Sequence, residues 1–200
     1  MYEPGLWTKK SNFELGTRVP LIIAAPHVTA SHGKRTSKMA ELVDVYPTVA
    51  ELAGLPLPPD VDGASLVPTF FDPAAPAGAK DYAFSEFPQC PTDPSVNLWH
   101  TGTGCQNAAR EQIGYFGFSV RSASFRYTEW HPWIGKELKA DWNMMTGVEL
   151  YDYTGVDMTD FDQFDRVNVA DAPEHAAVRA ELAAALRLHY SRMVSSSAGN

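Results

Sequence analysis

An apolar run followed by a loop and a helix near the start of the chain constrains the fold more than any other feature. Residues 18–25 form a short apolar run, which predicts a buried strand of a parallel sheet. After a polar loop, a helix is predicted over about 44–53. Asp44 is its expected N-cap, Pro47 lies in the first turn and Gly54 supplies the C-terminal stop. This order is typical of a doubly wound α/β layer.

The second half of the chain has a different pattern. Residues 115–121, 125–130 and 149–153 read as half-buried strands, the first of them with clear alternation. A helix predicted over 172–193 carries one apolar stripe, made by Val178, Leu182, Ala185, Leu186 and His189. Three strands and a packing helix predict an antiparallel α+β subdomain.

We therefore expect four divisions. Residues 1–87 form an α/β part that ends with a strand over 81–87, and 88–112 form an irregular loop. Residues 113–194 form the antiparallel subdomain, and 195–200 form a disordered tail.

Composition excludes several classes of function. The net charge of −8 argues against a general binder of nucleic acid or of membrane surfaces, since both are anionic. No apolar run approaches the length of a membrane span. Residues 1–4 lack the features of a signal peptide, although this says little if the native chain begins upstream.

Two cysteines flank the irregular segment. A disulfide between Cys90 and Cys105 would stabilise the fold by roughly 3 kcal/mol through loop closure. The alternative is two unpaired thiols, because two cysteines are few for a disulfide prediction. A zinc site lacks a second Cys or His pair at ligand spacing.

An acidic segment precedes the last helix. Asp157, Asp160, Asp162 and Asp165 suggest calcium, but the segment lacks the Gly and the final Glu of an EF-hand loop. It is interpreted as a solvated acidic turn.

Five phrases follow one another along the chain: Gly5–Glu14 with Arg18–Ile23, Glu41–Leu55, Gly117–Arg121, Phe125–Trp130 and Glu149–Asp152. Together they resemble, in the same order, the C-terminal portion of a type I sulfatase of the alkaline phosphatase-like superfamily, and they are most similar to the iduronate-2-sulfatase branch. The likeness spans most of residues 5–192.

The resemblance implies a fold and a reaction. The fold is the C-terminal part of a sulfatase-like doubly wound sheet, followed by a small antiparallel sheet with a packed C-terminal helix. The reaction is hydrolysis of a sulfuric ester on a sulfated sugar, with a glycosaminoglycan unit as the expected substrate. In such enzymes a formylglycine attacks sulfur and a divalent cation, usually calcium, binds the sulfate. Lys9 matches the active-site lysine of the family, and Lys10 and His100 are weaker candidates for substrate contacts.

The resemblance also implies that a part is missing. The nucleophile motif and the Asp-His-Gly metal motif do not occur in this chain, so no metal ligand is assigned to it and the cation is expected in the intact parent. The expected partner is the N-terminal half of the same enzyme, and the expected location is the secretory pathway, the lysosome, the periplasm or the outside of the cell. Pro4 stands where the family commonly has a histidine. Two alternatives stay open: a phosphodiesterase or phosphonate hydrolase of the same superfamily, and a non-catalytic remnant.

Overall fold

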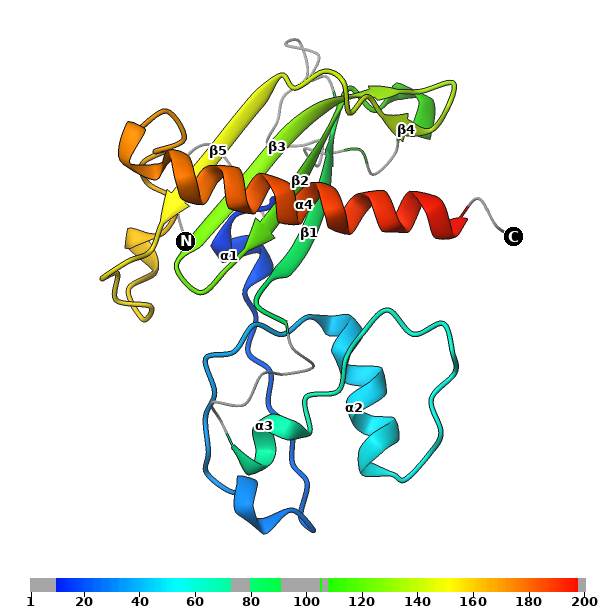
Figure 1. Ribbon diagram of the computed structural model, residues 1–200, viewed down its shortest axis with the longest axis vertical. Helices are drawn as coiled ribbons and strands as arrows, with labels where there is room; N and C mark the ends of the chain where they lie inside the picture. The colour runs from blue at the N-terminus through cyan, green and yellow to red at the C-terminus, as the bar shows by residue number, and fades with distance from the viewer. Residues whose placement is uncertain (1–9, 73–79, 91–104, 106–107, 198–200) are drawn as a thin grey trace. The chain divides into compact units, whose positions relative to one another are not determined.

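The computed structural model describes residues 10–72, 80–90, 105 and 108–197 (Figure 1). The chain divides into two compact units. One combines Met1–Arg18, Phe84–Val120 and Ser124–Asn200, and the other combines Val19–Ala83 with Arg121–Ala123. Each is described by itself.

A five-stranded sheet forms the centre of the first unit. Its strands are β1 (Ala83–Gln89), β2 (Tyr115–Arg121), β3 (Phe125–Ile134), β4 (Lys139–Ala140) and β5 (Gly147–Asp152). The order is β1-β2-β3-β4, and β5 also pairs with β3. Strands β4 and β5 are both antiparallel to β3, at different ends of it. The strand predicted over 81–87 therefore lies in the same sheet as β2. The sequence pattern instead assigns it to the α/β part formed by residues 1–87.

Helix α4 (Ala176–Ser197) lies across one face of this sheet (Figure 1). It follows the 3-10 turn η6 (Pro173–His175). The predicted apolar stripe is confirmed at its centre, because Leu182 and Leu186 are fully buried. The helix runs to Ser197, so three residues of the expected disordered tail are helical.

The segment before Arg18 packs with the last loops of the same unit. It contains the short helix α1 (Glu14–Thr17). Phe13 and Leu15 pack against a core cluster of Tyr151, Tyr153 and Phe164. Two further 3-10 turns among the described residues of this unit are η4 (Arg110–Gln112) and η5 (Phe161–Gln163).

The second unit contains little regular structure. Its main element is helix α2 (Val45–Leu52), preceded by the 3-10 turn η2 (Leu42–Asp44). The other elements are η1 (Thr29–Ser31) and α3 (Pro68–Phe71). The predicted helix is confirmed, but Asp44 makes no side-chain cap to α2.

Asp44 instead holds a loop against the start of the helix. Its carboxylate is fully buried and accepts hydrogen bonds from the backbone N–H of Glu41 and of Ala64, each at 2.8 Å. Lys80 Nζ lies 2.6 Å from the same carboxylate. Thr48 continues the connection, since its hydroxyl donates to the Asp44 carbonyl and accepts from the Leu66 N–H. Residues 62–66 are thereby fixed beside the helix.

One expectation for this unit is wrong. The apolar run 18–25 forms no strand, since no described strand pairs with its backbone, and Ile22 is 90% exposed. Helix α2 buries Pro47, Thr48 and Ala50, whereas Val49 is exposed. The unit therefore displays apolar side chains that the sequence pattern assigns to a core.

The fold class is confirmed as mixed α/β, with an antiparallel sheet and a packed C-terminal helix. None of the helices in the described ranges is long and apolar enough for a transmembrane segment.

Candidate functional site

The predicted catalytic lysine, Lys9, lies outside the described residues. The same is true of His100. Lys10, the weaker candidate, is the first described residue and is half-buried. The structure therefore describes the contacts of the segment that begins at Lys10, one residue after Lys9.

Asn12 is the first anchor of this segment. Its side chain is 4% exposed and its Nδ2 donates to the carbonyl oxygen of Gly117 on β2, at 2.9 Å. Its Oδ1 accepts from the hydroxyl of Ser85 on β1, at 3.1 Å. One amide group thus joins the N-terminal segment to two neighbouring strands.

Glu14 is the second anchor. Its carboxylate lies 2.6 Å from Arg126 Nη2, and both side chains are almost completely buried. Arg126 points from β3 to the face opposite Glu129, since successive strand residues face opposite sides. The same nitrogen donates to the Thr17 hydroxyl at 2.9 Å, so Arg126 holds both ends of α1.

Asp165 completes this cluster. Its carboxylate accepts the backbone N–H of Glu14 at 2.7 Å and a short hydrogen bond from the Tyr153 hydroxyl. Burial raises the pKa of Asp165, although the hydrogen bond from Tyr153 and the charge of Arg126 oppose that shift. The expectation of a solvated acidic turn is therefore wrong for this residue, because Asp165 faces the cluster.

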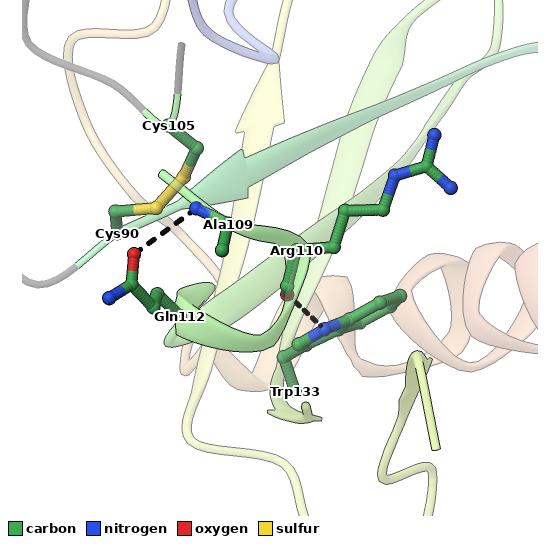
Figure 2. The surroundings of a disulfide bond; sticks show 6 residues. All are labelled: Cys90, Cys105, Ala109, Arg110, Gln112 and Trp133. Carbon is green, nitrogen blue, oxygen red and sulfur yellow. Dashed lines mark hydrogen bonds between the residues drawn. A yellow bond between two sulfur atoms is a disulfide. The ribbon is translucent and has the colours of Figure 1, made fainter. Parts of the chain in front are cut away.

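The two cysteines form a disulfide in the structure (Figure 2). Their Cα atoms are 5.4 Å apart, and no described cysteine is free. Beside the disulfide, η4 is held by a hydrogen bond of 2.9 Å from Trp133 Nε1 on β3 to the Arg110 carbonyl (Figure 2). A further bond of 3.1 Å joins the Ala109 N–H to the Gln112 side chain. The end of the irregular segment is thereby attached to the sheet.

The α4 face of the sheet contains another buried carboxylate, Glu129. It accepts hydrogen bonds from the Tyr127 hydroxyl at 2.8 Å and from Arg187 Nη2 at 3.1 Å, and His131 Nε2 lies 2.9 Å away. Burial would raise the pKa of Glu129, but the hydrogen bonds from His131, Tyr127 and Arg187 outweigh it and lower the pKa. Glu129 borders a cavity of about 410 Å³. Because its oxygens are already occupied, it is suited to joining α4 to β3 and not to accepting a proton.

No described cluster of three or more His, Cys, Asp or Glu side chains could hold a metal ion. Because the family resemblance places the calcium ligands outside this chain, no reaction step is assigned to a cation here. What the described residues can do chemically is narrower. They fix a lysine-bearing segment, by one buried amide and one buried ion pair, against a sheet.

Comparison with known proteins places the chain in a family. The family model described as "N-sulphoglucosamine sulphohydrolase, C-terminal" matches residues 2–102, just over half of the 200 residues. The chain belongs to this sulfatase family. The resemblance found in the short phrases is thereby confirmed.

Two named human relatives agree with that assignment. Human iduronate 2-sulfatase is 28% identical over 190 residues, covering 74% of this chain and 33% of the relative. Human arylsulfatase K is 42% identical over 60 residues, 30% of this chain and 11% of the relative. A solved structure of a sulfatase from Bacteroides thetaiotaomicron is 24% identical with a TM-score of 0.47, covering 74% of this chain and 24% of that one. The chain thus spans about a third of the length of human iduronate 2-sulfatase.

The anchors of the Lys9 segment were missed by sequence reasoning. Asn12 and Glu14 stand inside the phrase that carries the resemblance, yet no local pattern indicates that their partners are 105 and 112 residues away. One signal was available in β3, where Arg126 lies between the aromatic residues Phe125 and Tyr127. A buried Arg requires a carboxylate partner, so an Arg in this strand indicates that an Asp or Glu elsewhere in the chain pairs with it.

Proposed function

We propose that this chain forms the C-terminal part of a sulfuric ester hydrolase that acts on sulfated sugars. The family match over residues 2–102 carries this proposal. Similarity to human iduronate 2-sulfatase favours iduronate 2-sulfate or a related glycosaminoglycan unit as the substrate.

Lys9 is the proposed catalytic residue. A sulfuryl transfer places negative charge on the sulfate oxygens and on the leaving oxygen, and a preorganised ammonium group stabilises both. The anchored segment that begins at Lys10 supports this role, because a catalytic donor needs a fixed backbone. Lys10 and His100 are proposed as weaker substrate contacts.

The nucleophile and the calcium ligands are proposed to lie on a preceding part of the same protein. Two observations support this. The chain corresponds to about a third of its human relative. The second unit also exposes large apolar side chains, among them Ile22, Leu42 and Val49. Exposed apolar surface of this kind marks an interaction site.

The secretory pathway or an extracellular compartment is the proposed location. The disulfide between Cys90 and Cys105 supports it, since disulfides persist in oxidising compartments and are rare in the cytosol.

Sulfate release from a chromogenic aryl sulfate tests the proposal. The 200-residue chain alone is expected to show no release above the buffer blank. A longer product of the same gene that includes a formylglycine motif is expected to be active, and Lys9→Ala should lower its turnover by about 10²–10³. Lys34→Ala, at an exposed lysine of the second unit, is the control and should leave turnover unchanged.

Three results would contradict the proposal. Activity of the 200-residue chain by itself would show that the nucleophile is not upstream. Phosphodiester hydrolysis without sulfate release would favour a phosphorus enzyme of the same superfamily. A native transcript that starts at Met1, with no activity, would identify a non-catalytic remnant.

A further inference from the structure

The side-chain amide of Asn12 is buried and hydrogen-bonds to the sheet instead of to solvent. It is 4% exposed, and both of its polar atoms have partners on the sheet: the Gly117 carbonyl at 2.9 Å and the Ser85 hydroxyl at 3.1 Å. A buried amide with both ends satisfied defines its own orientation, because any rotation leaves a donor or an acceptor without a partner.

Gly117 makes the room that this amide occupies. A Cβ atom at this position would lie 2.9 Å from Asn12 Nδ2 and 2.7 Å from the ring of Trp130. The strand residue opposite the amide must therefore lack a side chain. The side chains of Asn12 and Trp130 both pack against the backbone of Gly117 on β2. Asn12 therefore fits a position that exists only because residue 117 is a glycine.

Asn12 lies three residues after Lys9 in the sequence. Phe13 packs into the core of the unit and Glu14 forms the buried ion pair with Arg126. Among these anchors Asn12 is the nearest to Lys9 in the sequence. The backbone at 12–14 is thus fixed by contacts to β1, β2 and β3, which are far from it along the chain.

We propose that Asn12 is a positioning residue, whose amide fixes the described backbone that starts at Lys10, next in the sequence to the proposed catalytic Lys9. The inference rests on the proposed role of Lys9. An ammonium group stabilises a transition state only at the correct distance, and a displacement of about 1 Å can cost on the order of 10²-fold in rate. Asn12 therefore contributes to turnover without touching substrate.

Distances between spin labels test the positioning directly in the 200-residue chain. Labels are attached at Lys10→Cys and at Leu188→Cys, which is 53% exposed on α4. The two native cysteines form a disulfide and do not react with the label. Double electron–electron resonance then gives the distribution of distances between residue 10 and the helix.

The labelled parent protein should give a narrow distribution. Asn12→Ala should broaden it, and so should Asn12→Asp, which keeps the shape of the side chain but presents an acceptor to the Gly117 carbonyl. The control is Asn168→Ala, because Asn168 makes a comparable side-chain bond to the Val148 carbonyl on β5, at 3.0 Å. This variant should leave the distribution narrow. A broad distribution in the parent, no change in both Asn12 variants, or equal broadening in Asn168→Ala would overturn the proposal.

Kinetics of the longer, active product separate this inference from the proposed function. Asn12→Ala should lower kcat at least tenfold with KM within about twofold, because the lost interaction acts in the transition state. Asn168→Ala should change neither. If Lys9→Ala keeps full activity, the proposed role of Lys9 fails, and the label distances still decide whether Asn12 fixes the segment. If Lys9→Ala is inactive while Asn12→Ala keeps full kcat, the inference about Asn12 fails alone.

Discussion

Two buried carboxylates, one in each unit, each fix a segment of the chain, one through partners nearby in the sequence and the other through a distant partner. Asp44 fixes the loop 62–66 beside helix α2, and its partners are at most 36 residues away in the sequence. Glu14 fixes α1 against the sheet, and its partner Arg126 is 112 residues away. Both side chains are almost fully removed from water.

The difference lies in what each carboxylate connects. Asp44 accepts two backbone N–H groups as well as the Lys80 ammonium, so it closes a local turn that forms with the helix. Glu14 has a buried guanidinium as its charge partner, which brings together distant parts of the chain. Burying both charges costs desolvation energy, and such a pair is better evidence for a defined arrangement than for stability. The comparison predicts that a substitution at the Glu14 site destabilises segments far apart in the sequence, whereas a substitution at the Asp44 site destabilises only its neighbours.

Removing Arg126 should have the largest effect. Arg126→Met leaves the Glu14 carboxylate buried without its cation, which is expected to lower the free energy of unfolding by about 3–5 kcal/mol. Urea denaturation measures the loss. Hydrogen exchange should rise both at 12–17 and at β3, segments more than a hundred residues apart.

Two control variants interpret that loss. Arg110→Met, at an exposed arginine of the same unit, should change stability by less than about 0.5 kcal/mol. The double variant Glu14→Leu with Arg126→Met should cost less than the sum of its single variants, because neither the Glu14 carboxylate nor the Arg126 guanidinium is left buried without the other. A loss below about 1 kcal/mol in Arg126→Met would mean that the pair does not hold α1.

Gly63→Ala should have a smaller and strictly local effect. A Cβ atom at residue 63 would lie 2.0 Å from the Val43 carbonyl oxygen, so the loop must move away from η2. We expect a loss of about 1–3 kcal/mol, with increased hydrogen exchange confined to 41–69. In Gly147→Ala the new Cβ would find its nearest atom at 3.5 Å, and stability should hardly change. Increased exchange in the sheet of the first unit would disprove the local character of the Asp44 site.

The limits of helix α2 could be predicted from the sequence, whereas the contacts of Asp44 and of Glu14 could not. Proline in the first turn and Gly54 at the end give the limits of helix α2 from residues within it, and the structure agrees closely. The partners of Glu14 depend on how β3 is placed, which no local pattern specifies. The same reason explains β1: its alternation predicts a strand, while its neighbour β2 begins 26 residues after β1 ends.

The segment 18–25 shows where a correct pattern fails to give a structure. Its apolar composition suits a strand, but a strand requires partners for its backbone N–H and C=O groups. No described strand supplies them. The candidate site was predictable in the same limited sense. Lys9 stays a prediction from its phrase, whereas Asn12, Glu14 and Arg126 are identified by their contacts in the structure.

Lys80 offers the smallest effect and a pH signature for the local site. Burial would lower the pKa of Lys80, but hydrogen bonds to Asp44 and Glu41 outweigh it and raise the pKa above 10.5. A raised pKa in the folded state contributes stability that is complete below pH 10.5 and is lost as the pH rises through the folded-state pKa. The stability of the second unit should therefore decline above pH 10.5, and Lys80→Met should remove that part of the decline while costing on the order of 1 kcal/mol at pH 8.

Methyl resonances of Ala50 and Leu66, both buried in the second unit, report its unfolding in urea between pH 8 and 11.5. Lys34→Met, at an exposed lysine of the same unit, should retain the alkaline decline of the parent protein. If Lys80→Met and the parent lose stability in parallel above pH 10.5, the Lys80 ammonium does not contribute to holding the loop, and Asp44 depends on its two backbone N–H donors alone.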